Sequence, residues 1–263
     1  MNRSNPIRKR IKDGEVLIGT MFKINSPALA ELVGNCGFDF IVIDTEHSNF
    51  SPVDTENIIR AADAAGMASI VRTRDGTPEE ILHALDSGAD GVQVPSLTTI
   101  EAAKRACESA KYFPEGNRGL STTQRSAKYA CWDLPESYFD HANQNTLVVA
   151  HVENLEMAEK LDELLAIPQL DTIFVGPGDL SQALGKPGQA DDPEVVALIE
   201  KIFKKVLASD KSLGIFCGGA AHVKKYIEWG ATYIAFGTDT TQIAAALKGN
   251  VKLAREAAAS AKK

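Results

Sequence analysis

The chain has 263 residues, of which 44% are hydrophobic and 24% charged, with a formal net charge of −7. This composition is typical of a soluble globular protein, and no apolar run approaches the roughly 20 residues that span a bilayer. The acidic balance disfavours a nucleic acid or an anionic membrane as a partner.

Eight short apolar runs have the composition and length of buried β-strands. They cover residues 16–22, 38–44, 69–73, 91–95, 147–153, 172–176, 213–217 and 233–237. Amphipathic stretches such as 26–37, 53–66, 78–88, 99–110, 155–166, 192–209 and 220–230 lie between them, and most end in glycine or a turn. Strict alternation of strand and helix implies parallel strands joined by right-handed crossovers.

Eight such units predict a closed sheet, and (β/α)8 barrels of about 250 residues fold as one unit. We therefore expect an α/β protein, a single (β/α)8 TIM barrel over residues 1–263, with residues 248–263 as a C-terminal helical extension. That extension either packs on a neighbouring subunit or is a solvated helix. Residues 113–135 lack periodicity and come after the fourth strand, where the functional loops of a barrel belong.

Charged side chains stand where several predicted strands end. The second strand runs into Asp44 and His47, the third into Arg72, the fifth into Glu153, and Asp179 follows the sixth. Parallel strands of one closed sheet end at the same mouth of the barrel. The sequence therefore predicts that these groups surround one active site.

The carboxylates of Glu153 and Asp179, with no cysteine nearby, favour a hard divalent ion, Mg²⁺ or Mn²⁺, with Co²⁺ as a further candidate. Two protein ligands would leave coordination positions on the ion for water and for a 2-oxo acid, whose enolate the ion would stabilise. Arg72 could add donors to the same oxyanion. His47 is the natural proton carrier, since the pKa of imidazole lies near neutrality, and Asp86 or Asp44 could orient it by hydrogen bonding.

Each of these residues also has an ordinary structural interpretation. Asp179 could cap a short helix, Arg72 could join a structural ion pair, and His47 could belong to a turn. One site explains all of them together, which favours the functional interpretation. Lys23 is the only lysine near a strand end and is the one candidate for a Schiff base, which the paired carboxylates disfavour.

The four cysteines show no close spacing, so reduced thiols are expected rather than a zinc knuckle or a disulfide framework. Residues 1–15 carry basic side chains with no apolar segment behind them, which argues against a secretory signal. The expected location is the cytoplasm.

Several motifs in chain order resemble the HpcH/HpaI family of class II, metal-dependent pyruvate aldolases. They are FDFIVIDTEHSNF, the Arg72 strand, LDSGADGVQVP, FPEGNRG, HVEN and IFVGPGDLS. The resemblance runs from about residue 18 to the eighth strand and covers members such as 4-hydroxy-2-oxoheptanedioate aldolase and 2-dehydro-3-deoxyglucarate aldolase. It implies a (β/α)8 barrel that assembles as a hexamer with its last helix exchanged between partners.

The same resemblance implies roles for individual residues. Glu153 and Asp179 would bind the metal, and Arg72 the pyruvate oxyanion. His47 would act through a metal-bound water as acid and base, with Asp86 and Asp44 as its orienting partners. The backbone at Gly178, after Pro177, would receive the pyruvate carboxylate, and the loop at residues 113–135 would contact the aldehyde.

His151 departs from the family pattern, in which many members have glutamine two residues before the metal-binding glutamate. Strand parity points His151 to the same inner face as Glu153. It could be a further metal ligand, a residue behind the ligands, or a core histidine, and the last two interpretations are favoured.

Three functions follow, in order of preference. The first is reversible cleavage of a 4-hydroxy-2-oxo acid to pyruvate and an aldehyde. The second is a carbon–carbon condensing synthase, for instance one that forms citrate from oxaloacetate and an acyl-CoA. The third is a barrel that binds a 2-oxo acid without catalysis. The expected partners are a small-molecule 2-oxo acid, pyruvate or oxaloacetate, and an aldehyde, with no nucleic acid and no membrane. The family resemblance implies a homo-oligomer.

Overall fold

The computed structural model describes residues 6–261. The predictions made for residues 1–5, within the segment examined for a secretory signal, and for residues 262–263, at the end of the C-terminal extension, lie outside this range.

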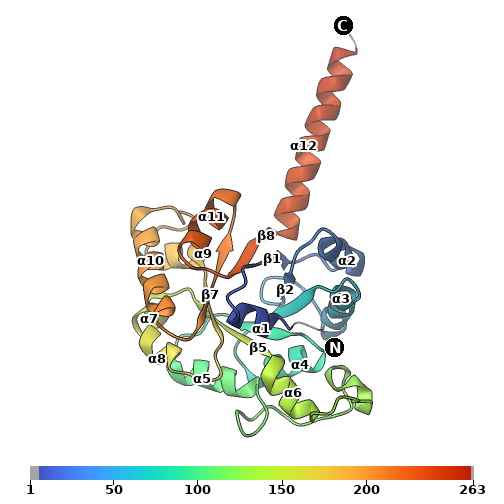
Figure 1. Ribbon diagram of the computed structural model, residues 1–263. Coiled ribbons are helices and arrows are strands. Elements are labelled where there is room, and N and C mark those ends of the chain that lie inside the picture. Colours follow the sequence, from blue (N-terminus) through green and yellow to red (C-terminus); the bar gives the residue numbers. More distant parts are fainter. Residues whose placement is uncertain (1–5, 262–263) are drawn as a thin grey trace.

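Eight parallel strands close into one barrel in chain order, which confirms the predicted fold class (Figure 1). The strands are β1 (Leu17–Phe22), β2 (Phe40–Asp44), β3 (Ala68–Arg72), β4 (Gly91–Val94), β5 (Leu147–Val152), β6 (Thr172–Val175), β7 (Ser212–Cys217) and β8 (Tyr233–Thr238). β8 pairs with β1 to close the ring, with one register shift between Gly19 and Met21. Each strand begins and ends within two residues of its predicted bounds.

Helices follow the strands and form the outer layer of the molecule. They are α2 (Pro27–Asn35), α3 (Pro52–Ala64), α4 (Pro78–Asp86), α5 (Ile100–Ser109), α7 (Leu155–Glu159), α8 (Leu161–Leu165), α9 (Pro177–Ala183), α10 (Pro193–Leu207), α11 (Ala220–Glu228) and α12 (Asp239–Ser260). Three elements lie outside this series: α1 (Ile7–Lys12), the 3-10 helix η1 (Arg125–Ala130) and α6 (Tyr138–Asn145).

Local sequence signals fix many helix ends. α3 begins with a capping box between Ser51 and Asp54, and proline occupies the first turn of α3 and four other helices, α2, α4, α9 and α10. Gly66 and Gly88 follow α3 and α4 with φ of 71° and 93°, a left-handed conformation that glycine adopts without steric cost. These signals turn the chain back toward the next strand.

Alternation along the strands separates two cores. In β2, Phe40 and Val42 belong to the core inside the barrel, whereas Ile41 and Ile43 pack against the helices outside. The same parity continues to Asp44, which therefore points inward at the end of the strand. Inward side chains at the strand ends are the ones that can line a mouth.

Helix α1 closes the other end of the barrel. Ile7 and Ile11 are buried within the interior core, and Arg8 donates from Nε to Asp171 just before β6 at 2.8 Å. The barrel is therefore accessible at the carboxyl ends of its strands, where the predicted site lies.

Residues 113–135 do not lie where the sequence analysis placed them. They follow α5, not β4, and lead through η1 to α6 and then into the start of β5. Part of the segment packs outside the barrel, where Gln124, Arg125 and Tyr129 line a surface pocket with Pro52 and Val53 of the first turn of α3. The contact of this loop with the aldehyde stays a prediction.

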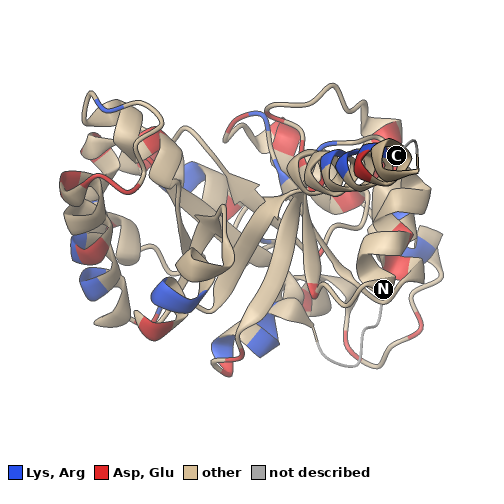
Figure 2. Cartoon of the chain, turned by 90° about the horizontal axis from the view of Figure 1, so that it is seen from above, with Lys and Arg blue, Asp and Glu red and all other residues tan. Residues whose placement is uncertain are grey.

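The C-terminal helix is longer than predicted. α12 starts directly after β8 and runs through residue 248 without a break, and it extends well beyond the barrel (Figure 1). In Figure 2, where α12 is seen nearly end-on, basic and acidic residues are interspersed over the helices. Within residues 6–261, no helix combines the length and the apolar character needed to cross a membrane.

Candidate active site

A cavity of about 490 Å³ opens at the carboxyl ends of the strands. Its walls come from β3 and from the segments that follow β2, β4, β5 and β6, and the lining residues are Glu46, His47, Arg72, Ser96, Thr98, Glu153, Asn154, Asp179, Gln182 and Ala183. The structure thus brings four of the predicted site residues, His47, Arg72, Glu153 and Asp179, to one cavity.

Asp44 and Arg72 form a two-pronged ion pair at the base of this mouth. Their Cα atoms are register partners in β2 and β3, and the guanidinium donates from Nε at 3.0 Å and from Nη2 at 2.6 Å to the two carboxylate oxygens. Asp44 is fully buried. Burial raises its pKa, but the bonds from Arg72, from the backbone N–H of His47 and from Lys23 outweigh this effect, so the pKa of Asp44 lies below its ordinary value.

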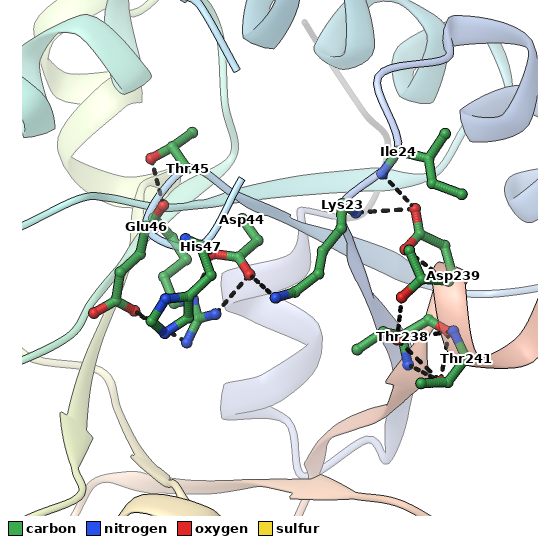
Figure 3. Close-up of polar contacts among 11 residues, drawn as sticks. Lys23, Ile24, Asp44, Thr45, Glu46, His47, Thr238, Asp239 and Thr241 are labelled. Atoms are coloured by element: carbon green, nitrogen blue, oxygen red, sulfur yellow. Dashed lines mark hydrogen bonds and ion pairs between the residues drawn. The ribbon is translucent and has the colours of Figure 1, made fainter. Parts of the chain in front are cut away.

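Glu46 holds the remaining end of the guanidinium. Arg72 Nη1 lies 3.1 Å from Glu46 Oε2, so a carboxylate stands at each side of Arg72. The His47 ring is largely exposed, and its Nε2 lies 3.5 Å from the same Glu46 oxygen (Figure 3). A hydrogen bond to Asp44 does come from His47, but from the backbone N–H at 3.1 Å. Asp44 thus fixes the turn that carries His47 and does not orient its ring.

Asp86 does not reach this cavity. It ends α4, which runs back toward the amino ends of the strands, and its carboxylate accepts a hydrogen bond from Arg118 at 2.6 Å. Asp86 instead lines a surface pocket with Pro52 and Val53 of the first turn of α3. Within one chain the structure shows no contact between Asp86 and His47, and their pairing stays a prediction.

Glu153 is a nearly buried carboxylate held on both oxygens. Oε1 accepts the backbone N–H of Ser96 at 2.6 Å, and Oε2 lies 2.6 Å from Nδ1 of His151. Burial raises the pKa of Glu153, but the hydrogen bonds and charges around it lower it more strongly, to about 2. Ser96 adopts a left-handed φ of 55°, a strained conformation for a residue other than glycine, and this conformation aims its N–H at the carboxylate.

His151 lies inside the barrel behind Glu153 and is 2% exposed. Its Nε2 lies 2.7 Å from Nε2 of Gln93, whose Oε1 accepts the hydroxyl of Tyr233 at 3.1 Å. Because the Gln93 amide nitrogen can only donate, His151 accepts at Nε2 and carries its proton on Nδ1, toward Glu153. His151 therefore lies behind the carboxylate and also stacks on Phe174, with 4.9 Å between ring centroids.

Glu153 and Asp179 face a common point. A methyl group built on Gly176, which links β6 to α9, would lie 3.1 Å from Asp179 Oδ2 and 3.5 Å from Glu153 Oε2. Asp179 does not cap α9, whose N-cap is Gly176, so its carboxylate is available to a ligand. Two carboxylates converging on an open space fit a hard divalent cation that takes its other ligands from water and substrate.

Residues 6–261 contain no set of three or more His, Cys, Asp and Glu side chains arranged to hold a metal on their own. The pair of Glu153 and Asp179 would therefore form an open site, as suits a catalytic rather than a structural ion. Pro177 and Gly178 form the first turn of α9 beside Asp179, and a side chain at Gly178 would meet open space. This position leaves room for a small group next to the carboxylates.

The charges of the cavity also favour a cation. Three carboxylates, Glu46, Glu153 and Asp179, stand against one guanidinium, Arg72. Such a lining repels an anionic substrate unless a divalent cation restores the balance. Lys23 Nζ lies 3.0 Å from Asp44 Oδ2, so the structure places the one Schiff-base candidate in an ion pair with a buried carboxylate.

Four residues that hold the charged groups of the site were not assigned from the sequence: Glu46, Ser96, Gln93 and Tyr233. The lining residues Thr98, Asn154, Gln182 and Ala183 were not assigned either. Glu46 lies between Asp44 and His47 in the sequence. Its position next to these two predicted site residues could have identified it as part of the site. Ser96 belongs to a short loop and acts through its backbone N–H, for which the side-chain pattern contains no signal. Gln93 is an inward-facing polar residue in an apolar strand, a pattern that predicts a buried hydrogen-bonded partner.

Known proteins resemble this chain over most of its length. The chain matches the family model described as HpcH/HpaI aldolase/citrate lyase over residues 18–246. It is 31% identical over 237 residues to the 2-keto-3-deoxy-L-rhamnonate aldolase of Escherichia coli (strain K12), across 90% of this chain and 88% of that protein.

Two solved structures resemble the whole chain. An HpcH/HpaI aldolase/citrate lyase family protein from Burkholderia cenocepacia J2315 has a TM-score of 0.90 at 27% identity, covering 97% of this chain and 100% of that chain. Citrate synthase SbnG has a TM-score of 0.86 at 28% identity, with 96% and 98% covered.

Proposed function

Because the chain belongs to the HpcH/HpaI aldolase/citrate lyase family, we propose that it is a class II aldolase that cleaves a 4-hydroxy-2-oxo acid reversibly to pyruvate and an aldehyde. The observation that carries the proposal is the convergence of Glu153 and Asp179 on one point in the cavity that also contains Arg72. The aldolase named among the relatives acts on a keto-deoxy sugar acid, which supports a polyhydroxylated 2-oxo acid as the substrate class.

In this proposal Glu153 and Asp179 hold a divalent ion, Mg²⁺ or Mn²⁺ with Co²⁺ as a further candidate. When bound, the ion supplies Lewis-acid stabilisation of negative charge on the 2-oxo group. The first turn of α9 at Pro177 and Gly178 lies beside the carboxylates and would receive the substrate carboxylate.

Arg72 and His47 divide the remaining chemistry. Cleavage removes the proton from the 4-hydroxyl, breaks the bond between C3 and C4, and leaves an aldehyde and the enolate of pyruvate, which then gains a proton at C3. Arg72, held flat between Asp44 and Glu46, would donate to the developing oxyanion. His47 stands exposed at the rim with Glu46 beside its ring, and would carry the proton away from the 4-hydroxyl.

The test measures the release of pyruvate from 4-hydroxy-2-oxo acids in an assay coupled to lactate dehydrogenase. We expect activity with Mg²⁺ or Mn²⁺, loss with excess chelator, and loss of at least about 100-fold in Glu153→Gln, which keeps the shape but not the charge. Full activity under chelation, or borohydride trapping of pyruvate on Lys23, would refute the proposal in favour of a Schiff base.

A condensing synthase is the second candidate. The likeness to citrate synthase SbnG, at 28% identity over nearly the whole chain, favours it. In that case the enolate of a 2-oxo or acyl substrate, formed in the same cavity, would attack an acceptor other than an aldehyde. Formation of a tricarboxylate from oxaloacetate and an acyl-CoA, detected by mass, would favour this candidate over the aldolase.

Assembly into a homo-oligomer, with a hexamer as the expected form, also belongs to this proposal. α12 extends beyond the barrel and exposes Leu247, Val251 and Leu253, with exposed fractions of 62%, 51% and 65%. A second copy of the chain is the partner that would bury these side chains.

A further inference from the structure

We propose that Lys23 is a positioning residue for Arg72, and that the first turn of α12 sets the place of Lys23. This inference rests on the proposed function, because it concerns how the cavity accepts the anionic 2-oxo acid. It arises from a chain of contacts that runs from α12 through Lys23 to Asp44 (Figure 3). From Asp44 the chain continues to Arg72.

The first link is the bond between Lys23 and Asp44. Strand parity in β1 places Leu17 and Met21 in the interior core, and the same parity points Lys23 inward just past the strand. Its Nζ lies 3.0 Å from Asp44 Oδ2, the oxygen that also accepts from Arg72 Nη2. Asp44 Oδ1 accepts from Arg72 Nε and from the backbone N–H of His47. Both oxygens of this buried carboxylate are therefore fully occupied.

The second link concerns charge. Arg72 lies between two carboxylates, Asp44 and Glu46, so these three groups alone carry a net negative charge. Lys23 adds one positive charge on the far side of Asp44 and brings the group to neutrality. Because an anion next to Arg72 would otherwise face a negative surplus, Lys23 leaves the guanidinium free to attract the substrate oxygens.

The third link joins Lys23 to α12. Asp239, the first residue of this helix, is 3% exposed, and its Oδ2 accepts the backbone N–H groups of Lys23 at 2.9 Å and of Ile24 at 2.8 Å. Its Oδ1 accepts the N–H of Thr240, and Thr238 caps the helix, so the carboxylate is fixed to the first turn. The backbone that carries Lys23 is thus held from one side by α12, while its side chain reaches Asp44 on the other.

Anion binding separates this role from a purely structural one. A structural pair would change the free energy of unfolding when broken and leave the affinity for a substrate-like anion unchanged. The probe is oxalate, a planar dianion that resembles the enolate of pyruvate, measured by calorimetry with saturating Mn²⁺. The variants are Lys23→Met, which removes the charge, and Lys23→Arg, which keeps it.

We expect Lys23→Met to bind oxalate about tenfold more weakly, and Lys23→Arg to bind within about threefold of wild type. The matched control is Lys205→Met, since Lys205 Nζ lies 2.7 Å from Asp162 in a pair on the outer helices. It should bind oxalate as wild type does. Thermal unfolding of each variant verifies that the barrel is intact.

A double-mutant comparison tests the link to α12. Asp239→Ala removes the acceptor for the N–H groups of Lys23 and Ile24 and should weaken oxalate binding. In a protein that already carries Lys23→Met, the same substitution should weaken the affinity for oxalate by no more than about a further twofold. Full additivity of the two losses would overturn the link to α12. If Lys23→Met binds oxalate with wild-type affinity, the proposed role of Lys23 is overturned but the proposed function is not. If the wild-type protein does not bind oxalate with Mn²⁺, the proposed function is overturned as well.

Discussion

The convergence of Glu153 and Asp179 can be tested by filling the space between them. Gly176 has φ of −98° and ψ of 91°, which any residue can adopt, so alanine is compatible with the backbone. The added methyl group would lie 3.1 Å from Asp179 Oδ2, 3.3 Å from Glu153 Cβ and 3.5 Å from Glu153 Oε2. These contacts require shifts of a few tenths of an ångström and no rearrangement of the fold.

The expected effects of Gly176→Ala on stability and on metal binding therefore differ. Restricting the unfolded chain stabilises by about 0.4–1 kcal/mol, which the tight contacts offset, so the free energy of unfolding should stay within about 1 kcal/mol of wild type. An ion held by both carboxylates needs oxygen atoms at about 2.1 Å and would meet the methyl group. We expect the affinity for Mn²⁺ to fall about 100-fold, or about 2.7 kcal/mol.

The assay is calorimetric titration with Mn²⁺ together with urea unfolding of the metal-free protein. Gly218→Ala is the matched control, since it follows β7 at the same end of the barrel and its methyl group would meet nothing within 4 Å. Wild-type affinity for Mn²⁺ in Gly176→Ala, with the fold intact, would show that no cation lies between Glu153 and Asp179.

Three further predictions concern charge, hydrogen bonding and assembly. The pKa of Glu153 is lowered from 4.5 to about 2, so its carboxylate stabilises the metal-free fold by about 3 kcal/mol above pH 4.5, and this contribution is lost as the pH falls through 2. The stability difference between wild type and Glu153→Gln should shrink accordingly in urea unfolding at decreasing pH, and a constant difference would contradict the assignment. Tyr233→Phe leaves Oε1 of Gln93 without its donor inside the barrel and should lower the free energy of unfolding by about 1–3 kcal/mol, whereas an unchanged urea midpoint would show that this bond contributes nothing. Leu253→Asp should reduce the mass measured by light scattering to that of one chain, while Lys252→Ala, a change at an exposed ion pair on α12, should not; equal masses for both would argue against α12 as the interface.

Alternation of strands and helices was enough to predict the barrel, because short, continuous apolar runs that alternate with amphipathic helices have few other arrangements. The positions of Asp44, Arg72 and Glu153 at strand ends predicted one common mouth. In the structure Arg72 and Glu153 line one cavity, and Asp44 pairs with Arg72 at its base. The sequence determines the strand ends well. The polar residue at the end of each apolar run is also the residue that lies at the mouth of the barrel.

Side-chain pattern determines less in the parts of the chain outside the strands. Asp86 and residues 113–135 stand at or after the end of a helix and do not line the cavity within one chain, so their roles at the site stay predictions. Ser96 acts through a backbone N–H that only its left-handed φ brings to Glu153. Such contacts depend on loop geometry, which no periodic signal encodes.

The closure of one end of the barrel by α1 has a kinetic consequence. Ile7 and Ile11 pack on the interior core at that end, and the candidate cavity opens at the carboxyl ends of the strands on the other side. The molecule held against Arg72 and Glu153 lies deeper than one that meets His47 at the rim. In the proposed reaction the 2-oxo acid would therefore bind before the aldehyde when the carbon–carbon bond forms, and would leave last in cleavage, which makes the order of addition a property of the fold.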